Sequence, residues 1–235
     1  MKNQIIPISM EEADVYAIEY FLSICGFQRE GEKYKRLAMQ GMEVKDKIKD
    51  RVRIQAIVSS YSKEIIEGNT AVIEDVTFVC NAFEQLNRDS IQSIYAFILT
   101  AGIYECNKAV PMIEQLYADI WGTAYVDAGL EVLKNRLLAD VRGKGDDQSV
   151  SAVLDSFGPG YYGMEVDQIG SFFKILNGGR IDVTVRDNCL MLPLKSCAGF
   201  FIAVDDETKL PSADCKSCRA EHKGCAYCQV QIKKR

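Results

Sequence analysis

The chain has 235 residues, 48% of them hydrophobic and 26% charged, so it is long enough to bury a full core. Its net charge of -5 argues against a nucleic-acid partner, because proteins that bind the phosphate backbone need a clustered basic surface. The longest apolar stretch, residues 91–104, is too short and too polar to cross a bilayer, and the first residues lack the apolar core of a secretory signal. We therefore expect a cytoplasmic protein with no membrane contact.

The first predicted element is a helix that begins after Ser9. Ser9 and Glu12 form a capping-box pattern, and apolar side chains then recur at helical spacing until Gly26. The Lys- and Glu-rich residues 30–49 predict an exposed second helix. Residues 52–66 alternate in polarity and are rich in β-branched side chains, which predicts a strand.

A turn at residues 68–70 separates this strand from a helix predicted over residues 74–86. Residues 91–99 form an apolar run, which predicts a buried strand closed by Thr100-Ala101-Gly102. The chain thus alternates between helix and strand in this part.

A long helix is predicted to begin at Pro111, a favoured first-turn residue, because apolar side chains recur at helical spacing as far as Val141. Gly122 and Gly129 mark the places where it would bend or split. The polar residues 143–147 then predict a loop between a helical half and a strand-rich half.

The second half begins with a predicted strand over residues 149–154. A loop at residues 157–163 follows, and a helix is predicted from 166 to 176. Two runs with the composition of strands, residues 180–186 and 190–203, complete this half.

The loop Phe157-Gly158-Pro159-Gly160-Tyr161-Tyr162-Gly163 is the first candidate for a binding site. Its three glycines let the backbone approach a ligand, and its two tyrosines can stack or hydrogen-bond. The alternative is a tight turn with both tyrosines on the surface, because glycine and proline are the ordinary turn residues.

Nine cysteines without a secretory signal suggest thiols or metal ligands, because the cytosol keeps thiols reduced. Five of them stand singly in or beside apolar segments and are interpreted as core residues, since free cysteine buries like a small hydrophobe. These are Cys25, Cys80, Cys106, Cys189 and Cys197.

The other four cysteines form two CxxC pairs, Cys215 with Cys218 and Cys225 with Cys228. Paired CxxC turns suit tetrahedral zinc, and four thiolates also suit an iron-sulfur cluster, so both metals stay open. His222, the only histidine, lies between the pairs and could replace one thiolate, although an exposed loop residue is the simpler interpretation. The alternative for the whole cluster is a reduced tail without a metal.

Several segments resemble, in order and spacing, the reactivation domain of cobalamin-dependent methionine synthase, and the resemblance extends over residues 70–205. It depends on Thr100-Ala101-Gly102, Ala118–Ala124, Gly158–Tyr161, Val183-Thr184-Val185, Met191-Leu192-Pro193 and Lys195–Gly199.

The resemblance implies an α+β fold, with a mixed, mainly antiparallel twisted sheet and flanking helices. It implies one such domain over residues 1–210, and the CxxC pairs predict a cysteine-rich metal-binding tail over residues 211–235. The implied function is that of a stand-alone reactivation partner of a corrinoid-dependent methyltransferase in methionine biosynthesis. Such a protein presents S-adenosylmethionine for the reductive remethylation of cob(II)alamin, and the partner's cobalamin-binding domain supplies the cobalamin. The expected electron donor is a flavodoxin-type or another redox protein.

The same resemblance places Pro159, Gly160 and Tyr161 against the ligand, with Gly158 beside them. Aromatic faces would take the sulfonium cation and backbone amides the carboxylate. Ser156 stands where the family usually has an arginine for that carboxylate, so binding is expected to be weak.

Two further family contacts are less definite. The position of a downstream family tyrosine falls at Lys209. Glu11, Glu12 and Asp14 are the candidates for an N-terminal acidic contact.

Ser156 also favours a rival function: a zinc- or iron-sulfur-bearing redox or docking protein for a corrinoid protein, without S-adenosylmethionine binding. A structural module held together by zinc is a third possibility. Trp121 and Tyr125 are interpreted as core rather than as a base-stacking platform. Triad hydrolysis is excluded because the single histidine lies among the cysteines.

Overall fold

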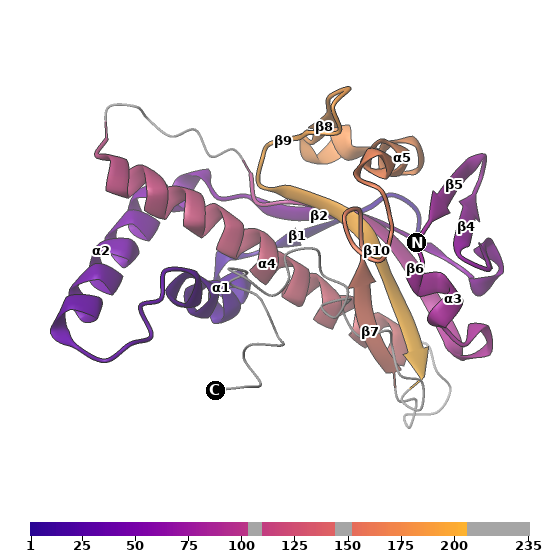
Figure 1. Cartoon of the computed structure of the whole chain (residues 1–235), viewed down its shortest axis with the longest axis horizontal. Helices are drawn as coiled ribbons and strands as arrows, with labels where there is room; N and C mark the ends of the chain where they lie inside the picture. Colours follow the sequence, from indigo (N-terminus) through magenta and orange to yellow (C-terminus); the bar gives the residue numbers. More distant parts are fainter. Residues whose placement is uncertain (103–109, 144–151, 206–235) are drawn as a thin grey trace.

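The computed structural model describes residues 1–102, 110–143 and 152–205 (Figure 1). Its centre is a five-stranded sheet with the order β1-β2-β6-β10-β7, in which every neighbouring pair is antiparallel. The strands are β1 (Gln4–Ile8), β2 (Ile54–Tyr61), β6 (Ile91–Thr100), β10 (Ser196–Asp205) and β7 (Ala152–Phe157). The predicted α+β fold with a mainly antiparallel sheet and flanking helices is therefore confirmed.

The two faces of this sheet carry different layers (Figure 1). Three long helices, α1 (Met10–Ile24), α2 (Glu32–Ile48) and α4 (Met112–Gly143), form the layer on one side: α4 packs on the sheet, and α1 and α2 pack against α4. Short elements cover the other: β3 (Ile66–Glu67), β4 (Thr70–Ile73), β5 (Val76–Val79), α3 (Ala82–Gln85), α5 (Ile169–Ile175) and the pair β8 (Thr184–Val185) and β9 (Met191–Leu192). Five short 3-10 turns connect described elements, at Lys49–Arg51, Lys63–Ile65, Arg88–Ser90, Val166–Gln168 and Gly178–Ile181.

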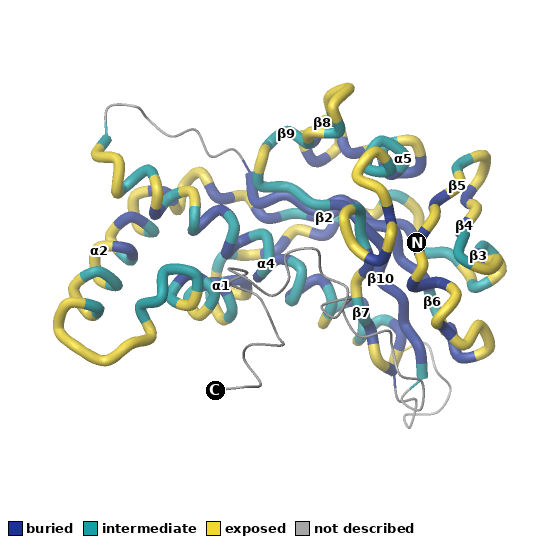
Figure 2. The backbone as a smooth tube through the Cα atoms, in the orientation of Figure 1, coloured by how far each residue is buried: buried dark blue, intermediate teal, exposed yellow. Residues whose placement is uncertain are grey.

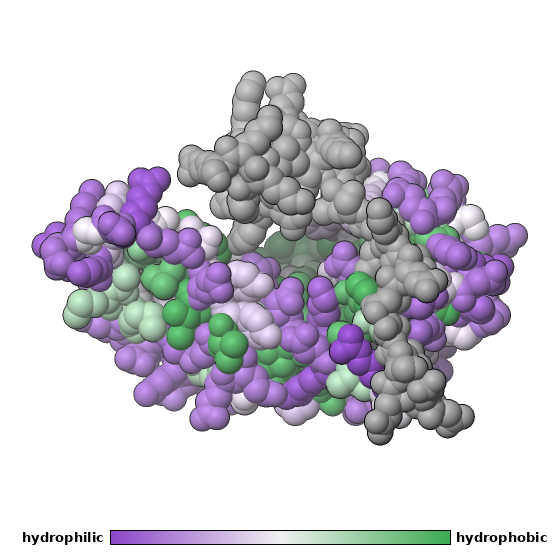
Figure 3. Space-filling view, turned by 90° about the horizontal axis from the view of Figure 1, so that it is seen from below, coloured by the Kyte–Doolittle hydropathy of each residue, from purple (hydrophilic) through white to green (hydrophobic). Residues whose placement is uncertain are grey.

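Strand β6 explains why the apolar run at residues 91–99 could be recognised. Its neighbouring residues Phe97 and Ile98 belong to different cores, because successive side chains of a strand point to opposite faces of the sheet. The strand is covered on both faces, and Figure 2 accordingly shows the middle of the sheet as the most buried part of the chain. Hydrophilic side chains predominate over the described part of the outer surface in Figure 3.

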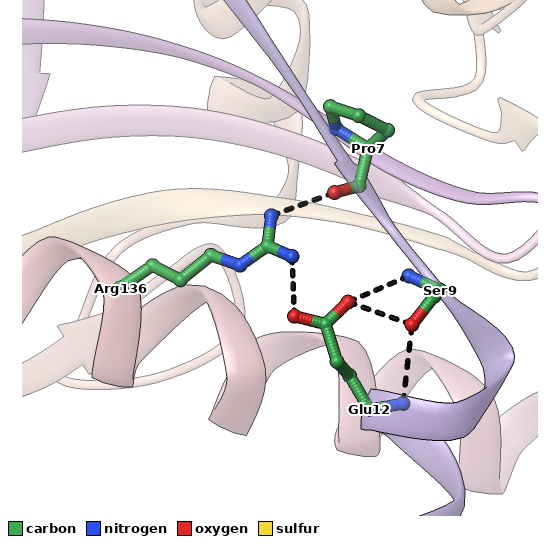
Figure 4. A network of polar contacts seen from close by, with 4 residues as sticks. All are labelled: Pro7, Ser9, Glu12 and Arg136. Atoms are coloured by element: carbon green, nitrogen blue, oxygen red, sulfur yellow. Dashed lines mark hydrogen bonds and ion pairs between the residues drawn. The ribbon is translucent and has the colours of Figure 1, made fainter.

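The predicted capping box at the start of α1 is present (Figure 4). The Glu12 N–H donates to Ser9 Oγ at 3.2 Å, and the Ser9 N–H donates to Glu12 Oε2 at 2.9 Å. Arg136 of α4 donates to the carbonyl of Pro7 at 2.6 Å and also to Glu12. These bonds lower the pKa of Glu12 to about 2, with the Arg136 hydrogen bond as the largest cause. The network therefore ties the start of α1 to the long helix.

Helices α1, α2 and α4 meet at a stack of aromatic rings. Trp121 lies parallel to Phe21 with ring centroids 4.1 Å apart, and its indole N–H donates to the carbonyl of Gly41 at 2.8 Å. A Cβ atom on Gly41 would lie 2.4 Å from the Phe21 ring, so α2 can approach only with glycine there. Trp121 and Tyr125 are fully buried, as predicted.

Helix α4 is continuous through both glycines at which the sequence suggested a bend or a split. A Cβ on Gly122 would lie 2.9 Å from Lys195, and one on Gly129 would lie 2.9 Å from Ile54. These glycines make room for neighbouring elements, and the expected interruption of the helix is wrong.

The helix predicted over residues 74–86 is also wrong. Strands β4 and β5 form a hairpin there, with Glu74 in its turn at a positive φ of 54°, and only residues 82–85 are helical. Alternate side chains of both strands face the core, as Ala71 and Phe78 do, so the local period is that of a strand.

Four other parts of the chain differ from the prediction, in whole or in part. Strand β1 was not predicted, because Pro7 interrupts its short apolar run; proline is tolerated here since β1 is an edge strand. Within residues 180–186, Thr184–Val185 form strand β8, whereas Arg180 and Ile181 belong to the 3-10 turn Gly178–Ile181, which Asp182 ends at a φ of 56°. The final long strand begins at Ser196, later than expected, and the strand expected at 149–154 lies at Ala152–Phe157.

The single cysteines follow the core interpretation only in part. Cys80 is buried, and Cys25 and Cys197 are partly buried and pack against a core. Burial raises the pKa of Cys25 to about 11 and, together with Asp127, that of Cys197 to about 12. Cys189 is not a core residue, because it lies half-exposed in a turn with a φ of 62°. Cys106 lies outside the described residues.

Within the described residues, no helix combines the length and the apolar character that a membrane crossing requires.

Candidate functional site

The candidate loop leaves the end of the edge strand β7 and leads toward α5 (Figure 1). It closes on itself through three backbone hydrogen bonds: from the Gly160 N–H to the Met164 carbonyl at 2.8 Å, from the Tyr161 N–H to the Gly158 carbonyl at 3.1 Å and from the Met164 N–H to the Tyr161 carbonyl at 2.9 Å. The Gly160 and Tyr161 amides are therefore engaged inside the loop. The expectation that the loop backbone offers its amides to a carboxylate does not hold for Gly160 and Tyr161.

The base of the loop packs directly on β10. A Cβ on Gly158 would lie 2.9 Å from the carbonyl oxygen of Ala198, and one on Gly199 would lie 2.6 Å from the carbonyl oxygen of Phe157. Side chains larger than hydrogen would force the two strands apart. The glycines at these two positions thus set how closely the loop lies on the sheet.

The tip of the loop is open at Gly160. Its φ of +92° favours glycine, and a Cβ there would have no neighbour within 4 Å. Gly163, at a φ of +72°, lies instead against Asn81, whose Nδ2 would be 2.5 Å from an added Cβ. The free space is at the Pro159–Gly160 side of the loop.

The two tyrosines have different surroundings. Tyr162 is 9% exposed, and its ring meets that of Phe157 edge-on with centroids 5.3 Å apart. Its carbonyl accepts the Asn81 N–H at 2.8 Å. Tyr161 is 69% exposed. The alternative of a turn with two surface tyrosines is therefore wrong for Tyr162, and Tyr161 is the one whose ring remains accessible.

Ser156 is exposed on β7, where the family resemblance placed an arginine. Its N–H donates to the Asp155 carboxylate at 2.8 Å. The charged group bonded to Ser156 is therefore negative, opposite to what a ligand carboxylate would need. Asn81 could not be found from sequence, because it contacts the loop from 81 positions away from Tyr162 and has no motif around it.

The other segments of the resemblance meet at the start of β10. The Lys195 carbonyl accepts the Ala101 N–H at 2.8 Å, and Ser196 Oγ donates to Thr100 Oγ1 at 2.9 Å and to the Pro193 carbonyl at 2.7 Å. Lys195 Nζ pairs with Asp119 of α4 at 2.7 Å. Segments that lie far apart in the sequence are thus joined by direct contacts.

A cavity of about 350 Å³ opens beside the Lys195–Asp119 pair. It combines an apolar wall with polar groups and is lined by Asp119, Asp182, Thr184, Leu192, Pro193, Leu194 and Lys195. A second hollow, of about 510 Å³, lies between the N-terminus, α5 and the turn after it. None of the predicted loop residues lines either of these two.

The N-terminal acidic residues serve the helical layer. Glu12 pairs with Arg136, and Asp14 accepts from Lys45 Nζ at 2.6 Å and from the Tyr125 hydroxyl at 2.9 Å. These bonds connect α1 to α2 and α4. Glu12 and Asp14 therefore have structural partners, which leaves Glu11, an exposed residue, as the candidate of the three.

The predicted metal ligands Cys215, Cys218, Cys225 and Cys228 lie outside the described residues, as do His222 and Lys209. In the ranges that the structure describes, no group of three or more His, Cys, Asp or Glu side chains could hold a metal ion. The metal site and the domain boundary near residue 210 stay predictions.

This chain is an α+β domain with two layers on an antiparallel sheet. Its fold is also found among solved structures. No family model and no curated protein sequence matches the chain. A crystal structure described as the MetH reactivation domain bound to AdoHcy superposes with a TM-score of 0.62, covering 99% of this chain and 89% of that one. Sequence identity over the match is 12%, so the likeness shows the fold, which is that of a MetH reactivation domain.

Proposed function

We propose that this protein is a stand-alone reactivation partner of a corrinoid-dependent methyltransferase, methionine synthase being the first candidate. It would present S-adenosylmethionine to a cob(II)alamin on the partner's cobalamin-binding domain. One electron from a donor reduces cob(II)alamin to cob(I)alamin, which takes the methyl group and leaves S-adenosylhomocysteine. A flavodoxin-type protein is the candidate donor.

The observation that carries this proposal is the extent of the fold match, which covers 99% of the chain. The matched domain is described as bound to AdoHcy, the form of S-adenosylmethionine that remains after methyl transfer. A fold shared over the whole chain supports a shared role better than one motif does, although a fold can host several functions.

The loop supports S-adenosylmethionine as the ligand. The exposed ring of Tyr161 offers a π-face to a sulfonium cation, and the open space at Gly160 admits a ligand against the backbone. Pro159 directly precedes Gly160 in the sequence, and Ser156 lies four residues before it. We assign Ser156, Gly158, Pro159, Gly160 and Tyr161 to the binding site.

The proposal includes weak binding. Ser156 supplies no positive charge, Asp155 lies beside it, and the Gly160 and Tyr161 amides are engaged within the loop. Loss of a charge-assisted bidentate contact costs about 1.5 to 3 kcal/mol, which corresponds to roughly ten- to a hundredfold in affinity.

Calorimetry with S-adenosylmethionine tests the ligand. Ser156→Arg should tighten binding roughly ten- to a hundredfold if the added guanidinium reaches the ligand carboxylate. Val153→Arg is the matched control, because Val153 is 39% exposed on the same strand but lies further from the loop. It should leave the affinity unchanged. No heat from millimolar ligand with either the wild type or Ser156→Arg would refute the ligand.

Reductive methylation tests the role. Full-length protein, a corrinoid domain in the cob(II)alamin state, titanium(III) citrate and S-adenosylmethionine labelled in the methyl group should yield labelled methylcobalamin. The same mixture without the protein gives the background rate. Yields equal to that background would refute the reactivation role.

Ser156 and the adjacent Asp155 favour a second candidate, a redox or docking protein for a corrinoid protein that binds no S-adenosylmethionine. Under this alternative, the C-terminal cysteines hold zinc or an iron-sulfur cluster. It predicts that the protein binds the corrinoid domain but produces no labelled methylcobalamin. A brown colour with matching iron content would favour electron delivery, whereas colourless zinc protein would favour docking.

A further inference from the structure

Lys195 lies in a notch of helix α4. A Cβ on Gly122 would be 2.9 Å from Lys195 Cγ and 3.0 Å from its Cε, so the lysine stem occupies the space that this glycine leaves free. At its end, Lys195 Nζ pairs with Asp119 at 2.7 Å and donates to Thr123 Oγ1 at 3.1 Å. The side chain is 15% exposed. The notch and the two polar partners together hold it in one place.

The backbone at Lys195 is joined to the end of β6. Its carbonyl oxygen accepts from the Ala101 N–H at 2.8 Å and from Thr100 Oγ1 at 3.3 Å. Thr100 Oγ1 also accepts from Ser196 Oγ at 2.9 Å. Lys195 therefore connects α4, β6 and the first residue of β10.

Strand β10 carries this connection to the ligand loop. Ala198 and Gly199, three and four residues beyond Lys195, contact Phe157 and Gly158 at the base of the loop. These contacts join backbone to backbone, with distances of 2.6 to 2.9 Å from the nearest carbonyl oxygen to an added Cβ. Closely packed backbone has no free space to absorb a shift, so a displacement at the start of β10 reaches the loop.

We propose that Lys195 is a positioning residue for the ligand loop, acting through its ion pair with Asp119. The pair holds the start of β10 against α4. Strand β10 in turn fixes the position of Gly158 against the sheet, and with it the position of the open loop tip at Gly160. This inference rests on the proposed function as far as it concerns ligand affinity.

The solvent exposure of Asp119 allows a positioning role of the pair to be distinguished from a general contribution to stability. The Asp119 side chain is 61% exposed, and ion pairs so close to solvent contribute little to the stability of a fold. Removing the charge should therefore change the loop and its ligand more than it changes the unfolding temperature.

Three variants of the full chain test the inference. Lys195→Met keeps the stem in the notch and removes the charge, Asp119→Asn removes the partner charge, and Asp119→Glu retains it. We expect Lys195→Met and Asp119→Asn to lower the affinity for S-adenosylmethionine by about 3- to 30-fold, the usual range for coupling between sites. Asp119→Glu should remain close to the wild type. The double variant Asp119→Asn with Lys195→Met should lose no more than either single variant, because the two residues act as a pair.

Hydrogen exchange of the loop gives a readout that needs no ligand. The engaged amides of Gly160 and Tyr161 should exchange faster in Lys195→Met than in the wild type. Gly129→Ala is the control, since its added Cβ would disturb Ile54 in the same layer without touching Lys195. It should lower the unfolding temperature and leave loop exchange unchanged.

The outcomes distinguish the two proposals. If the wild type gives no heat with S-adenosylmethionine but Lys195→Met speeds loop exchange, the proposed function fails and the positioning of the loop stands. If the wild type binds, and Lys195→Met shows unaltered affinity and unaltered loop exchange, the positioning role is wrong. Faster exchange in Gly129→Ala equal to that in Lys195→Met would also overturn it, because the effect would then be general.

Discussion

Glu12 is the residue with the clearest electrostatic role in the helical layer. Its carboxylate closes the capping box with Ser9 and pairs with Arg136 (Figure 4), and these contacts lower its pKa from 4.5 to about 2. Because the folded pKa lies below the unfolded one, the stabilisation is fully present above about pH 4.5. It is lost as the pH falls toward 2.

We therefore predict that Glu12→Gln is destabilising near neutral pH and less destabilising at pH 3, where part of this stabilisation is already lost. Glutamine can still close the capping box, so the variant removes mainly the ion pair, at a cost of about 0.5 to 1 kcal/mol. Urea unfolding at pH 7 and pH 3 measures the difference. Glu11→Gln, in the same helical turn, is the control and should have a smaller effect. A loss for Glu12→Gln of equal size at both pH values would contradict the assignment.

A second prediction at this scale concerns the thiols. Burial raises the pKa of Cys80 and, to about 12, that of Cys197, so both thiols are protonated at pH 8; Cys80 is also buried, whereas Cys197 is partly buried. Iodoacetamide should leave them unmodified in the folded protein and alkylate half-exposed Cys189, as measured by peptide mass spectrometry. Full labelling in guanidinium chloride is the control. Rapid alkylation of Cys197 in the folded state would show that its side of β10 is accessible.

Individual elements could be predicted where the sequence carried both a period and a boundary signal. Helix α1 has its capping box, and the buried run of β6 ends at a polar threonine and a glycine. The β4–β5 hairpin was missed because its strands are short. The acidic residue of its turn, Glu74, could equally occupy a polar position of a helix. The sequence shows where Gly122 lies in α4. It does not show that Gly122 makes room for the Lys195 side chain, because that contact depends on tertiary packing.

The junction of α1, α2 and α4 supplies a prediction for an element. Gly41→Ala places a Cβ 2.4 Å from the Phe21 ring, which is stacked on Trp121. Alanine gains about 1 kcal/mol of helix propensity, but overpacking a core costs about 1 to 3 kcal/mol, so a net loss of stability is expected. Thermal unfolding measures it, and near-UV circular dichroism of Trp121, the only tryptophan, reports the stack.

Gly170→Ala in α5 is the matched control for that experiment. An added Cβ there meets nothing within 4 Å, so this change should be neutral or stabilising by about 0.4 to 1 kcal/mol. If both variants lost the same stability, the Phe21 contact would not explain the effect at Gly41.

For the whole molecule, the ordered resemblance predicted the α+β fold, while the two layers and the strand order had to come from the structure. The candidate loop could be located because glycine and proline mark it, whereas the open space at Gly160 became visible only in the structure. The separation of Tyr161 from Tyr162 could not be predicted, because it depends on where Phe157 and Asn81 lie in three dimensions.

The last prediction concerns the division of the chain into a domain over residues 1–210 and a metal-binding tail. The described members of both cores extend to Val204, and we expect the fold to be independent of the tail. Cys225→Ser should therefore leave the unfolding temperature of the main domain unchanged while lowering the metal content. Ordering four thiolates costs chain entropy that a metal would offset, and we expect one zinc or one iron-sulfur cluster per chain, with zinc favoured. Elemental analysis of anaerobically purified protein decides it: zinc and iron both below roughly a tenth of an equivalent, the level of stray binding to thiols, would refute the metal site.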